Sequence, residues 1–411
     1  MRDRSDLQNL PRLLGTYPPG GGPAGTVGAK KGEKLLILVG GLHGNEPAGV
    51  RAILRFFEEL KESPLPIDGC VVGITGNVRA LREGGRFLVH DLNRLWTEET
   101  VQLGPGLDGA CGAPIGESVS GSEGNTEEVE QQEILRELRR LLDREPECAV
   151  LLDLHSTSAE GPPFAIMADT LQNRSIASAL QIPIVLGLEE LVQGTLLAWF
   201  SEMGHCAVCI EGGQSDLDST VDHHLASIWI TLVTAGLLAE SEVSNFAALR
   251  ERLAATVWGL PEFCEIKYRY GVPPGGKFEM EAGFTNFHLV SQGTELAQMS
   301  VDGETKRIRC PQDGQLIMPR YQGQGADGFF IGREIPSWAL RLSTAIRYLR
   351  LSPLLRLLPG VRRNPDRVRG LIVDRRIARW RTLEILHLFG YRRCGREGYL
   401  LYFLRRPDRF S

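Results

Sequence analysis

The chain has 411 residues, of which 42% are hydrophobic and 24% are charged, and its formal net charge is -5 at pH 7. This composition is ordinary for a globular protein of two or three domains, and no apolar run approaches the ~20 residues of a membrane span. The N-terminus lacks the apolar stretch of a secretory signal, so we expect a cytoplasmic protein with no membrane partner.

The first half of the chain predicts strands that alternate with helices. Apolar runs at residues 35–39 and 70–75 read as buried strands. Between them, residues 46–62 have helical periodicity, with Asn45 as the expected N-cap. The Gly-rich residues 102–125 are expected to form a surface loop. Further strand-like runs lie at residues 150–154, 164–167, 182–185 and 207–210. This alternation predicts an α/β class, a sheet flanked by helices.

The second half has a different texture. From about residue 256, short alternating segments such as 284–290 and 295–299 predict a smaller all-β domain. Residues 341–411 then hold 18 arginines, no lysine and five acidic residues, so this tail carries +13 and residues 1–340 carry -18. It has helix-like stretches at 339–351 and 376–388 and a strand-like stretch at 399–404. We therefore expect three parts: residues 1–255, 256–337 and an Arg-rich extension at 338–411.

The first group of chemical residues stands at 40–46 (GGLHGNE), where a predicted strand ends and a helix begins. In open α/β sheets, ligands bind beyond the carboxyl ends of strands. His43 supplies a nitrogen and Glu46 an oxygen, both normal zinc donors. Gly44 would let the backbone turn tightly between them.

A second strand ends in a histidine, His155, in the run 151–157 (LLDLHST). His43, Glu46 and His155 together form the usual donor set of a catalytic zinc site with one open position, although either histidine alone reads as a satisfied core residue. Asp153 shares the strand face of His155 and is expected to accept its second ring N–H. Glu211 ends another buried strand and is either a helix cap or the acid–base group that activates water.

Residues 86–94 (RFLVHDLNR) combine two arginines with an asparagine. Arg86, Asn93 and Arg94 are suited to clamp a carboxylate, and one arginine could stabilise a developing oxyanion. A surface cluster of ion pairs with Asp91 is the alternative reading. His90 is not expected to be a ligand.

Taken together, these motifs resemble the succinylglutamate desuccinylase/aspartoacylase family, which is related to zinc carboxypeptidases. The resemblance covers residues 12–335 and implies a zinc carboxypeptidase-like domain with a mixed sheet at 1–255 and a β domain that caps the pocket at 256–337. It also implies the site residues: His43, Glu46 and His155 as ligands of one zinc ion per chain, Asp153 and Asp91 behind them, Arg86 on the amide carbonyl, Asn93 and Arg94 on the substrate carboxylate, and Glu211 as general base.

The sequence departs from the aspartoacylase branch at two places. Ser201 stands where that branch has a further substrate-binding arginine, and no tyrosine occupies residues 327–330, where the branch has one that faces the substrate. Tyr321 is a candidate replacement. Both departures point away from N-acetylaspartate, and a small-molecule substrate with one carboxylate remains compatible.

The leading functional hypothesis is hydrolysis of the amide bond of a small N-acyl amino acid. A metallocarboxypeptidase that removes a C-terminal residue from a peptide would use the same chemistry, so the motifs do not separate the two. A third hypothesis, of another class, is a binding protein that acts through its basic tail. Because the rest of the chain is acidic, we expect the tail to dock on its own body or at a homo-oligomer contact, and nucleic acid binding is the less favoured reading.

Overall fold

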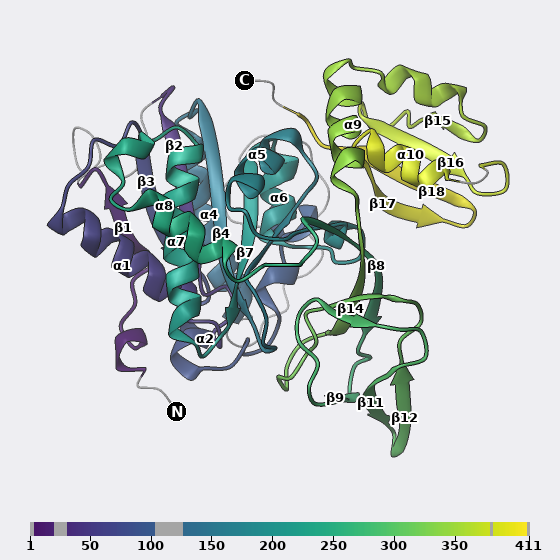
Figure 1. Cartoon of the computed structure of the whole chain (residues 1–411), viewed down its shortest axis with the longest axis horizontal. Coiled ribbons are helices and arrows are strands. Elements are labelled where there is room, and N and C mark those ends of the chain that lie inside the picture. Colours follow the sequence, from purple (N-terminus) through teal and green to yellow (C-terminus); the bar gives the residue numbers. More distant parts are fainter. Residues whose placement is uncertain (1–3, 20–30, 103–125, 379–380, 409–411) are drawn as a thin grey trace, which may run out of the picture.

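A mixed sheet of eleven strands runs through the structure, a computed structural model that describes residues 4–19, 31–102, 126–378 and 381–408 (Figure 1). All but the first residue of the loop predicted at 102–125 lie outside the described residues. In spatial order the strands are β1 (Leu13–Tyr17), β3 (Cys70–Thr75), β2 (Lys34–Gly40), β4 (Cys148–Thr157), β7 (Cys206–Gln214), β5 (Phe164–Met167), β6 (Ile184–Leu186), β8 (Phe263–Gly271), β14 (Asp327–Glu334), β13 (Gly314–Ile317) and β10 (His288–Val290).

Helices cover both faces of the first seven strands. They are α1 (Ala48–Glu62), α2 (Val78–Glu83), α3 (Glu98–Gln102), α4 (Thr126–Leu142), α5 (Leu171–Ala179), α6 (Leu196–Glu202), α7 (Asp218–Thr234) and α8 (Phe246–Ala254). Along β2, Leu36 and Leu38 pack with α1 and α7, whereas Leu35 and Ile37 pack with α4 and α6 on the other face. Both faces of β2 are therefore buried, as its continuous apolar run predicts.

The start of α1 corrects one local prediction. Asn45 is not the N-cap, because the helix begins after Pro47 and no side chain caps its first turn. The Asn45 side chain instead donates a hydrogen bond to Gln322 Oε1 at 2.6 Å, across 277 residues of sequence. The Asn45 side chain, which the local sequence predicts to cap α1, therefore makes a long-range hydrogen bond instead.

The predicted β region is continuous with the main sheet. Strand β8 pairs in parallel with β6, and β14, β13 and β10 follow it in antiparallel order. A separate three-stranded sheet lies beside them: β12 (Glu304–Arg309), β11 (Glu295–Val301) and β9 (Lys277–Met280). Residues of this region therefore line the same cavity as residues at the carboxyl ends of β2 and β4.

The Arg-rich extension folds around a core of its own. It contains α9 (Ser337–Tyr348), α10 (Thr382–Leu388) and a four-stranded sheet: β15 (Val361–Arg363), β16 (Gly370–Asp374), β18 (Leu400–Arg405) and β17 (Tyr391–Glu397). The helix predicted over 376–388 is wrong at residues 376–378, because residues 375–377 form a turn after β16, and residues 379–380 lie outside the described residues. None of the described helices has both the length and the apolarity that a membrane span requires.

The extension is held against the rest of the chain by buried ion pairs. Arg392 of β17 contacts Asp169 at 3.2 Å and Glu265 at 2.9 Å, and Arg347 of α9, with no exposed surface, contacts Asp169 at 3.2 Å. These contacts join arginines of the positively charged extension to acidic residues of the negatively charged remainder of the chain, as the charge distribution predicts.

Candidate metal and catalytic site

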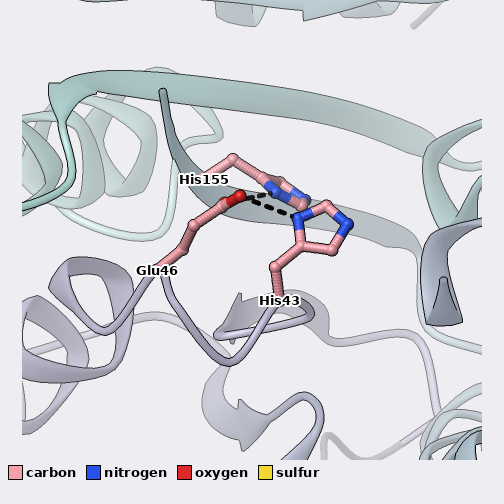
Figure 2. Close-up of side chains that lie close together, drawn as sticks. All are labelled: His43, Glu46 and His155. Carbon is pink, nitrogen blue, oxygen red and sulfur yellow. Dashed lines mark hydrogen bonds and ion pairs between the residues drawn. The ribbon is translucent and has the colours of Figure 1, made fainter. Parts of the chain in front are cut away.

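The three predicted ligands meet at the carboxyl ends of two neighbouring parallel strands. Gly40, the last residue of β2, lies beside Leu154 of β4 in the sheet register, so the residues that follow each strand emerge together. His43 and Glu46 come from the turn between β2 and α1, and His155 lies near the end of β4 (Figure 2). All three are buried, and their donor atoms lie within 4.8 Å of one another.

Glu46 stands between the two histidines. His43 Nδ1 lies 2.9 Å from Glu46 Oε1, and His155 Nδ1 lies 3.0 Å from Glu46 Oε2. Two ligands bound to one zinc ion through bonds of about 2.1 Å stand up to about 4 Å apart, so these spacings suit a shared ion. The 2.9 Å approach of His43 Nδ1 to Glu46 does not have hydrogen-bond geometry, and this buried nitrogen has no hydrogen-bond partner within the described residues.

A carboxylate backs each histidine on the side away from Glu46. His155 Nε2 lies 3.0 Å from Asp153 Oδ2, and His43 Nε2 lies 3.1 Å from Asp91 Oδ1. Such carboxylates accept the second ring N–H of a metal-binding histidine and fix its tautomer. Asp153 and Asp91 thus occupy the positions that their predicted role requires.

Gly44 is needed for a steric reason rather than for a left-handed backbone. A Cβ at this position would lie 2.1 Å from the backbone carbonyl of Ala80 in α2. The Gly44 N–H also donates to Arg86 O at 3.0 Å. The turn that carries His43 and Glu46 is therefore pressed against its neighbours, and only glycine fits.

The charges of the site are strongly coupled. Burial disfavours the ionised form of Glu46, but His43 and His155 outweigh it and hold the pKa of Glu46 well below its ordinary value. Burial likewise disfavours charged His155, yet Asp153 and Glu46 hold the pKa of His155 well above its ordinary value. In this arrangement a positive charge is strongly favoured beside Glu46, as a cation site requires.

Glu211 lies next to His155. The two residues are register partners across β4 and β7, and Glu211 is 7% exposed. Burial, supported by the nearby charge of Glu46, raises the pKa of Glu211 to about 7. Its Oε2 has no hydrogen-bond partner within the described part of the chain. A free carboxyl with a pKa near neutrality is suited to take and return a proton.

The predicted clamp residues also line this cavity. Arg86 Nη1 donates to Glu46 Oε1 at 2.9 Å, so its guanidinium reaches the predicted metal ligands. Arg94 Nη2 donates instead to Asp327 Oδ2 at 2.8 Å. The Asn93 side-chain oxygen accepts from Leu196 N–H at 2.9 Å, which orients its amide group within the cavity wall.

Two charged lining residues, Arg320 and Asp327, were not predicted. Both come from the β region, and no local pattern marks them, because only the pairing of β8 with β6 brings their loops to the site. The suggestion of Tyr321 is wrong: its side chain is not part of the lining, and its hydroxyl donates to Glu281 O at 2.8 Å. Ser201 is buried inside α6, away from the cavity lining.

Comparisons with known proteins agree with this geometry. Residues 32–235 match the sequence profile of the succinylglutamate desuccinylase/aspartoacylase catalytic domain. The chain is 34% identical over 67 residues to a succinylglutamate desuccinylase of Photorhabdus laumondii and 36% identical over 70 residues to one of Pseudomonas paraeruginosa. Each of these alignments spans 16–17% of this chain and 21% of the relative.

A crystal structure shares the fold more widely. The succinylglutamate desuccinylase/aspartoacylase of Rhodobacter sphaeroides superposes with a TM-score of 0.50 at 16% identity, over 74% of this chain and 87% of that chain. At this identity the likeness concerns the fold alone, a mixed α/β sheet flanked by helices.

Proposed function

Because the chain belongs, through its catalytic domain, to the succinylglutamate desuccinylase/aspartoacylase family, we propose that it hydrolyses the amide bond of a small N-acyl amino acid. The products are a carboxylate and a free amine. The observation that carries the proposal is the buried group of His43, Glu46 and His155 with Glu211 beside it.

We propose that His43, Glu46 and His155 hold one zinc ion per chain. The nitrogen–oxygen–nitrogen donor set supports this assignment, as do the carboxylates behind both histidines. Within the described residues, His43 Nδ1 also makes no hydrogen bond that would compete with a metal. When bound, zinc supplies Lewis acidity, which polarises a carbonyl group and makes water a stronger acid.

Glu211 is the proposed general base and acid. Its carboxylate accepts a proton from the attacking water as the new bond to the amide carbon forms. It then returns that proton to the leaving nitrogen as the carbon–nitrogen bond breaks. A pKa of about 7 allows both transfers near neutral pH.

The arginines and Asn93 orient the substrate. Arg86 is proposed to donate to the amide oxygen and to stabilise the negative charge that develops there. Asn93 is proposed to contact the carboxylate-bearing half of the substrate, whereas Arg94, predicted for the same role, donates to Asp327. Their place on the cavity wall beside Arg86 supports this arrangement.

The test combines metal analysis with a substrate panel. We expect one zinc ion per purified chain and turnover of at least one N-acetyl or N-succinyl amino acid. A short peptide with a free C-terminus, assayed beside the panel, addresses the carboxypeptidase alternative. Faster release of its C-terminal residue than of any acyl group would contradict the proposal.

A single substitution tests the role of Glu211. Glu211→Gln keeps the size of the side chain but cannot accept a proton, so turnover should fall on the order of 10²-fold or more. Zinc content should not change, because Glu211 is not a proposed ligand. Asp366→Asn, at an exposed position of the extension, serves as the matched control. Unchanged turnover in Glu211→Gln would remove Glu211 from the mechanism.

A further inference from the structure

Arg94, the residue expected to grip the substrate carboxylate, is already occupied. Its Nη2 donates to Asp327 Oδ2 at 2.8 Å, and its Nη1 donates to Asn93 O at 2.7 Å. Asp327 also accepts from Arg269 Nε. The charge of Arg94 is therefore at least partly balanced by the protein's own carboxylate, and Nη1 and Nη2 each already donate to a protein acceptor.

Arg320 is in the opposite situation. It lines the same cavity and is only 7% exposed, yet none of the described carboxylates lies within 4.0 Å of its guanidinium. Its Nη1 donates to Gly325 O, its Nε has no hydrogen-bond partner among the described residues, and its guanidinium carbon lies 4.9 Å from the centre of the Phe278 ring. Burial lowers the pKa of Arg320. A buried cation without a carboxylate is costly, and an anionic ligand would compensate it.

The position of Arg320 relative to Arg86 indicates which anion would fit. A Cβ built on Gly325 would lie 3.8 Å from Arg320 Nη1 and 3.9 Å from Arg86 Nε. The two guanidinium groups therefore flank the same glycine. Arg86 is the proposed partner of the amide oxygen, so an anion held by Arg320 lies close to the scissile amide.

We infer that Arg320 is the anchor of the substrate carboxylate and that the substrates are N-acyl α-amino acids with a free α-carboxylate. In such compounds one carbon atom separates the carboxylate from the amide nitrogen, which matches the closeness of Arg320 to Arg86. This inference rests on the proposed function. In this assignment the ion pair between Arg94 and Asp327 joins the cavity wall to the β region. The positive charge of Arg320 recognises the substrate carboxylate.

The experiment compares each substrate with a neutral copy of itself. Zinc-loaded wild-type protein is assayed on N-acetyl-L-amino acids and on the corresponding α-carboxamides. Arg320→Ala should lower kcat/KM for the acids by about 10- to 100-fold, the worth of a hydrogen bond to a charged group, mainly through KM. The carboxamides should change by less than about 3-fold, since they carry no charge to anchor. Arg320→Lys should restore part of the loss on the acids.

Controls separate specificity from folding. Arg333→Ala removes an exposed arginine of β14 and should affect neither substrate class. An equal loss on acids and carboxamides in Arg320→Ala, or a selective loss on the acids in Arg94→Ala alone, would overturn the assignment. Failure of the proposed function has another signature: the wild-type protein itself would hydrolyse neither member of any pair.

Discussion

Asp169 is the centre of the contact between the Arg-rich extension and the catalytic region, and its charge is open to a direct test. The side chain is 1% exposed and lies 2.7 Å from Arg174 Nε, 3.2 Å from Arg347 Nη1 and 3.2 Å from Arg392 Nη2. Burial opposes its ionisation, but the three arginines outweigh burial and hold the pKa of Asp169 well below its ordinary value. Asp169→Asn removes the charge and keeps the shape.

The size of the effect follows from what each arginine retains. Arg347 keeps the carboxylate of Asp408, and Arg392 keeps Glu265 at 2.9 Å. Arg174 keeps hydrogen bonds to uncharged oxygens of α9. Removal of one partner from a buried ion pair lowers the stability by about 3–5 kcal/mol. Because two of the arginines keep another carboxylate, we expect Asp169→Asn to cost about 3 kcal/mol, the lower end of this range. If the extension opens as a local unit, its opening equilibrium rises by about 150-fold.

Hydrogen exchange read by mass spectrometry measures this opening segment by segment. Amides of β16, β18 and α9 should exchange about 150-fold faster in Asp169→Asn at neutral pH, while those of β2 and β4 keep their protection. Asp366→Asn, an exposed acidic residue of the same extension, is the matched control. Unchanged exchange in the extension would show that the buried arginines do not hold it in place.

Two further predictions concern the metal ligands and the docking contact. Asp153→Asn replaces the carboxylate behind His155 with an uncharged amide, so zinc affinity should fall by about 10- to 100-fold. Competition with a chromophoric chelator measures this affinity. Equal affinities in the variant and the wild type would refute the supporting role of Asp153. For His387, burial opposes the charge, but Glu190 and Glu265 raise its pKa. Its stabilising contribution is therefore full below about pH 6.5 and is lost as the pH rises through the raised value. His387→Gln should lower the melting temperature at pH 6 but not at pH 9, and a deficit that persists at pH 9 would contradict this linkage.

The grouping of His43, Glu46 and His155 was predictable from sequence because its determinants are local. The apolar run of β2 ends just before His43, and that of β4 ends at His155. Neighbouring parallel strands bring their carboxyl ends to one edge of the sheet, and the observed register places Gly40 beside Leu154. Two strand predictions and one rule of α/β topology were enough to bring the donors together.

The cap of α1 and the identity of the β-region residues depend on contacts that no local pattern contains. Asn45 is a residue type that is common at N-caps, but its side chain donates a hydrogen bond to Gln322 and does not cap α1. Tyr321 was a reasonable choice by residue type, whereas its neighbour Arg320 faces the cavity. The choice between adjacent residues is set by the loop between β13 and β14, whose path follows from the long-range pairing of β8 with β6.

Charge composition predicts that buried arginines of this chain will find acidic partners, and Arg347 and Arg392 meet that expectation at Asp169. Arg320 is an exception to this rule. It is also buried, but none of the described carboxylates lies within 4.0 Å of its guanidinium. Composition cannot separate the two cases, since all three arginines stand outside any motif. Only the folded chain shows which of these arginines is already paired with a carboxylate. The unpaired one, Arg320, lines the cavity of the candidate site, where the proposed substrate would supply a carboxylate.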